Sequence, residues 1–320
     1  MPGKRSIPKE RYERQRKARE IRRALAAITP ENSRPQRQSP LFSVLPAELR
    51  VLIFQFVLSQ ALDLARPLDI HCNSPLYRPG HTHHATLDIS LLLTCRLVYC
   101  EAHTIPVRSA TYHFGHLSGA SCLYNDSAWL HHVTKQHGAE LYHLHDNVIS
   151  IRSNHVTKFL LPHLHWRKIT WTVCGYLLTP RLYAEQTGFD SPANTLAGLT
   201  LPASCKEVTL ELETREDLLD DWPQLLQQAK ACQQVSLMRS DGTTLELDNR
   251  YVVRYKWVGS GQLQEGIRED ALLTKYTMVY HTIRLCWRAK LARREYMSYD
   301  RLDCLRLEGC AEVTEIMALE

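Results

Sequence analysis

The chain has 320 residues, enough for about two domains, and its formal net charge of +5 is unevenly distributed. Residues 1–38 hold twelve Lys and Arg against four Asp and Glu, whereas residues 39–320 hold 27 against 30, so only the N-terminal segment is basic. Apolar residues make up 44% of the chain, which allows a packed core and excludes wholesale disorder. The most apolar run, residues 51–58, is far shorter than the roughly 20 residues that cross a bilayer.

The ten cysteines are scattered along the chain, with no Cys-x-x-Cys pair and no dense disulfide framework. Scattered reduced thiols are typical of nuclear and cytosolic proteins. The first five residues bring charge where a signal peptide needs an apolar stretch. We therefore expect an intracellular protein, in the nucleus or the cytoplasm, with no membrane partner.

The basic N-terminal segment, residues 1–40, is predicted to be a disordered arm and linker. Helix-forming residues dominate 9–27 and favour a transient basic helix, but its apolar face is too thin to dock strongly. Pro30, Pro35 and Pro40 break any helix and mark the linker. Because Lys and Arg neutralise phosphates, the arm within residues 1–38 supports one functional hypothesis, a nuclear nucleic-acid-associated protein.

Residues 41–114 are predicted to form a compact unit of two helices and a strand. Pro46 suits a first helical position, and apolar residues follow at helical spacing on one continuous face: Leu49, Leu52, Ile53, Phe56 and Val57. Residues 63–87 contain three prolines and polar turn formers and are predicted to be a loop. A second helix is expected from about residue 89 until Pro106 ends it, followed by a short strand over 110–114.

Residues 115–320 are predicted to form an irregular mixed α and β body. Helix-like stretches at 155–161 and 215–231 alternate with short β-rich runs at 148–151, 168–173, 207–212, 235–238 and 244–247. Asp241-Gly242 predicts a hairpin turn, and residues 251–257 alternate as in a half-exposed strand.

The end of the body is predicted to be a long amphipathic C-terminal helix. Its apolar residues follow one another in steps of four and three: Leu272, Tyr276, Val279, Ile283 and Cys286. Arg284 and Arg288 would then belong to the charged outer face of this helix.

Catalytic motifs are absent from the sequence. There is no Gly-x-x-x-x-Gly-Lys-Ser/Thr loop, no Gly-x-Gly-x-x-Gly after a strand, no Gly-x-Ser-x-Gly elbow and no His-Glu-x-x-His. Gly259-Ser260-Gly261 lacks a following Lys and helix start, and is predicted to be a turn. Cys95 and Cys100 would lie about 500° apart in rotation on a helix, so they do not share a face. We therefore expect no enzymatic activity, no catalytic residues and no cofactor.

Histidine is concentrated in one part of the chain, with fifteen of sixteen between His71 and His165. Zinc requires three or four ligands, and a zinc-dependent module is one hypothesis for a cluster formed by Cys72, His81, His83 and His84. We favour a solvated histidine-rich loop without a metal, because these residues are not paired on a tight turn or helix face. The pairs His143-x-His145 and His163-x-His165 lie in segments predicted to be helical or irregular.

Two motifs occur in order within residues 41–114. They are Leu45-Pro46-Ala47-Glu48-Leu49-Arg50-x-x-Ile53-Phe54 and Leu91-Leu92-Leu93-Thr94-Cys95-Arg96-x-x-Tyr99-x-Glu101-Ala102. This region resembles the fungal F-box-like proteins, which share Leu-Pro-x-Glu-Leu-Arg-x-x-Ile-Tyr, then Leu-Leu-x-Thr-Cys-Arg-x-x-Tyr-x-Glu-Ala, and then a short aromatic strand.

The resemblance implies a tethering module. In F-box proteins the Leu-Pro start, the first helix and a Cys-Arg segment dock onto the Skp1 adaptor of a cullin-RING ubiquitin ligase. By position, these residues are Leu45, Pro46, Leu49, Ile53, Cys95 and Arg96. The favoured hypothesis is thus a substrate receptor that binds an Skp1-like adaptor and an unknown client. In the alternative, the same residues merely form a two-helix cap over the α/β layer.

Overall fold

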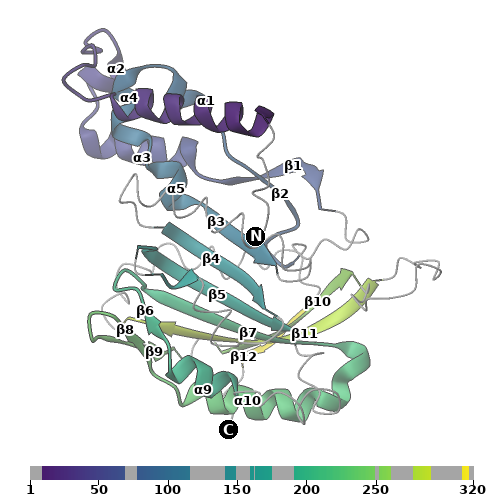
Figure 1. The fold of residues 1–320 in the computed structure, drawn as a ribbon. Coiled ribbons are helices and arrows are strands. Elements are labelled where there is room, and N and C mark those ends of the chain that lie inside the picture. Colours follow the sequence, from purple (N-terminus) through teal and green to yellow (C-terminus); the bar gives the residue numbers. More distant parts are fainter. Residues whose placement is uncertain are drawn as a thin grey trace, which may run out of the picture. The chain divides into compact units, whose positions relative to one another are not determined.

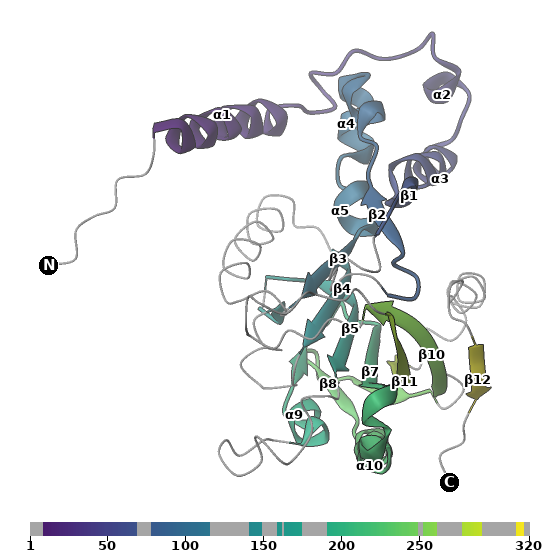
Figure 2. The ribbon, with the colours of Figure 1, turned by 90° about the vertical axis from the view of Figure 1, so that its right-hand side faces the viewer.

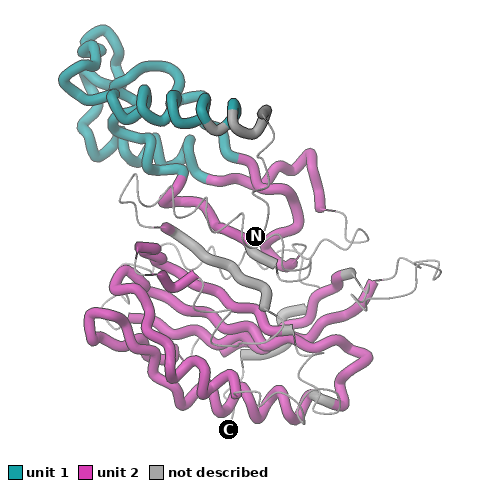
Figure 3. Tube along the Cα trace, viewed as in Figure 1, with its two compact units in different colours: residues 1–59, 87–106 teal, residues 60–86, 107–320 magenta. Residues whose placement is uncertain are grey.

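The structure is a computed structural model that describes residues 9–68, 78–115, 141–148, 159–161, 163–174, 191–248, 252–260, 277–289 and 312–316. It is a mixed α and β protein, as expected, and it contains a curled β-sheet and several helices. The chain divides into two compact units (Figure 3). Unit 1 contains residues 1–59 and 87–106, and unit 2 contains residues 60–86 and 107–320.

Unit 1 consists of helices (Figure 1). In chain order these are α1 (Lys9–Ala26), α2 (Pro40–Ser43), α3 (Ala47–Leu58), the 3-10 helix η1 (Ser90–Leu93) and α4 (Arg96–Ala102). The predicted helix after Leu45 is confirmed as α3, with Pro46 as its N-cap residue.

The second predicted helix is wrong in its bounds. The segment is broken between η1 and α4, where Cys95 is extended and caps α4 by accepting a hydrogen bond from the Val98 N–H at an S···N distance of 3.5 Å. Pro106 does not end a helix. It is the second residue of α5 (Ile105–Ser109), a position where the N–H that proline lacks has no intrahelical partner.

The predicted loop 63–87 is wrong in part, because β1 (Ala61–Pro67) and β2 (His83–Thr86) form a two-stranded antiparallel sheet. Most of their residues are exposed, so neither strand has the buried face that would give a clear apolar alternation. Arg78 and His81 form an isolated antiparallel bridge within the connection between these strands.

Unit 2 is built on a ten-stranded sheet. Four successive strands pair in parallel: β3 (Thr111–Gly115), β4 (Leu141–Val148), β5 (Trp166–Cys174) and β7 (Glu207–Arg215). The antiparallel strand β11 (Thr277–Arg288) pairs with the whole of β7 through its residues 280–288. Beyond β11 the sheet has two branches. In one branch β11 pairs with β10 (Val253–Ser260), which pairs with β12 (Glu312–Ile316). In the other, the order after β11 is β9 (Thr244–Leu247), β8 (Leu237–Arg239) and β6 (Thr200–Leu201). Figure 2 shows the sheet curling where β10 and β11 run side by side.

The predicted C-terminal helix is wrong over residues 277–288, which form β11, and residues 272–276 lie outside the described part. β11 is largely buried on both faces, so its apolar residues show no strict alternation. Without that alternation, the spacing of Val279, Ile283 and Cys286 imitates a helical period. Arg284 and Arg288 therefore lie on a strand and not on the outer face of a helix.

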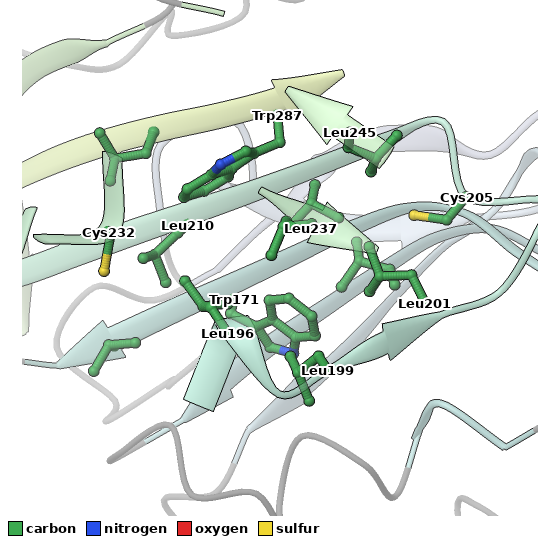
Figure 4. Packing of buried hydrophobic residues seen from close by; sticks show 14 of the residues in the cluster. Trp171, Leu196, Leu199, Leu201, Cys205, Leu210, Cys232, Leu237, Leu245 and Trp287 are labelled. Atoms are coloured by element: carbon green, nitrogen blue, oxygen red, sulfur yellow. The ribbon is translucent and has the colours of Figure 1, made fainter. Parts of the chain in front are cut away.

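Helices cover one face of the sheet, namely α9 (Pro192–Ala197), the 3-10 helix η4 (Glu216–Asp221) and α10 (Trp222–Gln233) (Figure 1). The predicted helix over 215–231 thus begins later, because Arg215 ends β7. Side chains from α9, α10 and the sheet form the main apolar core (Figure 4), which includes Trp171, Leu196, Leu210, Cys232, Leu237 and Trp287.

The predicted strands at 168–173, 207–212 and 244–247 are confirmed within β5, β7 and β9. The predicted hairpin is also confirmed, since β8 pairs antiparallel with β9. Gly242 in its turn has a φ of +79°, a left-handed conformation that glycine adopts without steric cost. The predicted strand at 148–151 and helix at 155–161 lie almost entirely outside the described residues.

Two segments that were not predicted to be strands belong to the sheet. His143 and His145 lie in β4, a strand paired on both sides, so this segment is neither helical nor irregular. Gly259 lies in β10 and not in a turn. A Cβ atom at Gly259 would come within 2.8 Å of both the Trp257 and Tyr280 rings, which stack on each other, so glycine is needed there for close packing.

Candidate functional site

The outer face of α3 is apolar and exposed. The apolar stripe predicted from the sequence lies on this face: Leu49, Leu52, Ile53, Phe56 and Val57. Phe56 is 88% exposed and Leu52 is 58% exposed, values that are unusual for large apolar side chains in a folded unit. We call these five residues the α3 outer stripe.

The inner face of α3 is formed by Arg50, Phe54 and Leu58, which are spaced by four residues. Phe54 and Leu58 are fully buried, and they pack in a small core with Val98, Ala102 and Ile105. Because this core is filled by the inner face, the α3 outer stripe is not needed to hold unit 1 together.

Arg50 joins the two sequence motifs. Its Nε and Nη2 atoms donate to the two carboxylate oxygens of Glu101 at 2.9 and 2.8 Å, and its Nη1 donates to the Leu45 carbonyl at 2.8 Å. A bidentate pair of this kind fixes both position and orientation. The Arg of the first motif and the Glu of the second therefore hold α3 against α4.

The structure places the six residues suggested by the resemblance in different environments. Leu49 and Ile53 are exposed on the α3 outer stripe, and Pro46 is exposed at the helix start. Leu45 and Cys95 are partly buried, and Cys95 packs against the small core while capping α4. Arg96 is exposed and donates to the Asn32 carbonyl at 3.3 Å.

A second arrangement, which the sequence analysis missed, lies on the face of unit 2's sheet opposite the helices. Glu207, Glu211 and Glu213 alternate along β7, and each is at most 4% exposed. We call these three residues and their partners the β7 charge layer. A buried carboxylate is costly unless it is paired and hydrogen-bonded, so the partners decide whether this layer is stable.

Glu207 lies between two cations. Its Oε1 is 2.8 Å from Lys168 Nζ, and its Oε2 is 2.8 Å from Arg288 Nη2. Burial alone would raise the pKa of Glu207, but the charges of Lys168 and Arg288 lower it below its usual value. The carboxylate is therefore held in its charged form.

Glu211 accepts hydrogen bonds from side chains on three other strands, β5, β10 and β11. Glu211 accepts from Thr172 Oγ1 at 2.7 Å, from Tyr255 Oη at 3.1 Å and from Arg284 Nη2 at 2.7 Å. Burial, followed by the charge of Glu211, raises the pKa of Tyr255, so its hydroxyl stays a donor.

Glu213 is bound by groups that stack on one another. It pairs with Arg78 and accepts from Trp257 Nε1 at 3.1 Å, while the Arg78 guanidinium lies over the Trp257 ring at 5.2 Å. The segment between β1 and β2 thus contributes a cation to the β7 charge layer.

Three buried cysteines are poorly suited to act as nucleophiles. Burial raises the pKa of the thiols of Cys205, Cys232 and Cys286 to about 12 in each case, so they stay protonated. Among the described residues, no group of three or more His, Cys, Asp or Glu side chains is arranged to hold a metal ion.

The residues of the zinc hypothesis are not brought together as far as the structure describes them. Cys72 lies outside the described residues. His81 is buried, with its ring stacked on His113 at a centroid distance of 3.9 Å. His83 Nδ1 lies 2.9 Å from Thr82 Oγ1.

A buried histidine, His281, lies on the helix-covered face of the sheet. His281 is 2% exposed, and neither of its ring nitrogens has a hydrogen-bond partner among the described residues. Its ring lies edge-on to Trp222, with centroids 5.8 Å apart. Burial lowers the pKa of His281, and the nearby charges of Lys256 and Arg254 lower it further against the opposing effect of Glu216.

Comparisons of the chain with protein-family models, curated proteins and solved structures found no match. Among the described helices, none has the length and apolar character needed to span a membrane.

Glu211→Gln is expected to destabilise unit 2 by about 3 kcal/mol, because the change leaves the partly buried Arg284 without its counter-charge. All six tryptophans of the chain lie in unit 2, so tryptophan fluorescence during urea unfolding measures this unit. The control is Glu20→Gln, which breaks an exposed pair with Arg16 and should cost less than about 1 kcal/mol. Equal effects of the two substitutions would contradict a structural role for the β7 charge layer.

His281 is expected to make unit 2 less stable in acid. Its folded-state pKa lies below the value of about 6.5 in the unfolded chain, so the unfolded chain binds the proton more readily. The stability from neutral His281 is complete above pH 6.5 and declines as the pH falls below it. His281→Phe keeps an aromatic ring beside Trp222 and removes this dependence. The stability difference between wild type and His281→Phe, measured by urea unfolding, should therefore change between pH 7.5 and 5.5; a constant difference would refute the assignment.

Proposed function

We propose that this chain is a non-catalytic protein-binding protein whose α3 outer stripe docks onto an Skp1-like adaptor. It would thereby serve as a substrate receptor of an Skp1–cullin ubiquitin ligase, with an unknown client. The observation that carries the proposal is the exposure of a contiguous apolar stripe on a helix whose inner face is already packed. Contiguous exposed apolar surface in a soluble unit is a typical mark of a protein interface.

The spacing of the stripe supports a helix-in-groove mode of binding. Leu49, Leu52, Ile53 and Phe56 follow the i, i+3, i+4 and i+7 pattern by which amphipathic helices fill an apolar groove. Burying one large apolar side chain contributes roughly 1.5–3 kcal/mol, so a few of these residues suffice for a stable contact. Leu49 and Ile53 also occupy positions that the resemblance to F-box-like proteins assigns to adaptor binding.

The chemistry of unit 2 is consistent with a role in recognition. Each of its three buried carboxylates on β7 is paired with a cation, and Glu211 and Glu213 also accept hydrogen bonds from hydroxyl or indole groups. This pairing is typical of carboxylates with a structural role. In the proposed function the covalent chemistry takes place on the ligase, and this chain brings the client to it.

Leu49→Arg combined with Ile53→Arg is expected to abolish co-purification with an Skp1-like adaptor on co-expression. Both side chains are at least 40% exposed, so the substitutions should leave the helical content of unit 1 intact, as circular dichroism can verify. Val51→Arg combined with Gln55→Arg is the matched control, because it adds the same two positive charges to α3 at exposed positions off the stripe. Absence of wild-type co-purification, or binding that survives the double substitution, would refute adaptor binding.

A second candidate function, nucleic-acid association through residues 1–38, is favoured by α1. This helix has eight Lys and Arg against three Glu, and its described side chains are exposed. Nuclear nucleic-acid association would use these cations to neutralise phosphates.

Affinity for DNA or RNA should then fall steeply with salt, by about 10³-fold between 50 and 200 mM if six phosphates are neutralised. Deletion of residues 1–38 should abolish binding, while Leu49→Arg with Ile53→Arg should leave it unchanged. Fluorescence anisotropy with labelled duplexes measures this, and salt-independent binding would exclude the arm as its source.

A further inference from the structure

We propose that unit 2 contains a binding site for a small oxyanion of the phosphate class, formed by Thr214, Arg254, Lys256 and His281. The site is separate from the α3 outer stripe and does not depend on the proposed adaptor binding.

Strand register brings these four residues together. His281 on β11 pairs with Thr214 on β7 and with Lys256 on β10, so the three form one row across the sheet. Arg254 lies two residues from Lys256 on β10, and alternation places both on the same face. Trp222, the first residue of α10, closes the group, because the Arg254 guanidinium lies 4.3 Å from the centre of its ring and His281 contacts the same ring.

The group contains four buried polar atoms without a hydrogen-bond partner among the described residues: Nδ1 and Nε2 of His281, Oγ1 of Thr214 and Nε of Arg254. His281 and Thr214 are 2% and 1% exposed. Such atoms are few in native proteins, and leaving a buried donor or acceptor unsatisfied is costly. Their concentration in one group points to a ligand that completes their hydrogen bonds.

The charge of the group selects the ligand. Among the side chains that the structure describes, none forms an ion pair with Arg254 or Lys256, in contrast to the cations of the β7 charge layer on the opposite face. Their register partners on β12, Glu315 and Glu312, lie outside the described side chains. A cation would be repelled by these two side chains, whereas an oxyanion accepts from the Arg254 Nε–H, the Lys256 ammonium, the Thr214 hydroxyl and the His281 N–H. A phosphate that retains one proton can also donate to the second His281 nitrogen.

Stacking on Trp222 holds the Arg254 guanidinium in one orientation. Arg254 and Lys256 are only partly buried, so the group can be reached from the surface beside them. The two cations therefore lie nearer to solvent than His281 and Thr214.

Calorimetric titration of the full chain with inorganic phosphate, at constant ionic strength, tests the proposal. Saturable binding is expected, and Arg254→Met or Lys256→Met should weaken it by about tenfold or more, since each removes a charged hydrogen bond. Lys230→Met, which removes an exposed cation from α10, is the control and should leave the affinity unchanged. Lys256→Met changes a partly exposed side chain, so it should fold even if substitutions at His281 do not.

Proton NMR provides the second measurement. Phosphate should raise the pKa of the His281 imidazole, whose signal is identified by its loss in His281→Phe, because an anion stabilises the protonated ring. A parallel titration with O-phosphoserine separates two sources: binding of both ligands indicates a site for phosphoryl groups on larger molecules, and binding of phosphate alone indicates the free ion. No saturable binding of either, or binding unaffected in Arg254→Met and Lys256→Met, would overturn the proposal.

Discussion

The pairing of the buried β7 glutamates is the constraint on which unit 2 depends. One face of β7 contributes Leu210 and Leu212 to the apolar core, and the opposite face buries three carboxylates. Charged groups in such a position are tolerated only with close partners. For Glu207 and Glu211 the paired cations come from the adjacent strands β5 and β11. Lys168 stands directly opposite Glu207 on one side of β7, and Arg284 stands opposite Glu211 on the other. A shift of register by one residue would turn cations into the core and carboxylates away from their partners, so the β7 charge layer specifies the alignment of β5, β7 and β11.

The same layer explains how much of unit 2 could be predicted from sequence. The β-rich run at 207–212 was predicted, because its apolar and polar residues alternate. Its burial on both faces was not, because the partners of the glutamates lie far along the chain: Arg284 is 73 residues from Glu211. The misassignment of β11 has the same origin. A strand that packs apolar residues on one face and buries arginine stems against carboxylates on the other loses the period of two by which strands are identified.

Unit 1 shows the complementary situation, in which the sequence predicted the element and its apolar stripe but not which side faces inward. The inner face includes Arg50, a residue that sequence patterns place in solvent, and only its pairing with Glu101 makes that position favourable. The residues implied by the resemblance therefore fall into two groups. Leu49 and Ile53 are exposed on the surface of α3, whereas Cys95 packs against the core of unit 1. The His281 group had no sequence signal beyond the isolation of this histidine from the other fifteen, because its members come from three strands that only the fold aligns.

The separation of the two motifs by the segment around β1 and β2 also has a structural explanation. The chain leaves unit 1 after Ser59 and returns at Leu87, and the intervening residues belong to unit 2. Arg78 from this segment supplies the cation that Glu213 requires, and its guanidinium lies over Trp257. The insertion is thus part of the β7 charge layer and not a passive linker between two helices. Cutting the chain after residue 114 would separate residues 60–86 and 107–114 from the rest of unit 2 and leave Glu213 buried without Arg78. The boundaries of the motifs are therefore not the boundaries of an independent folding unit.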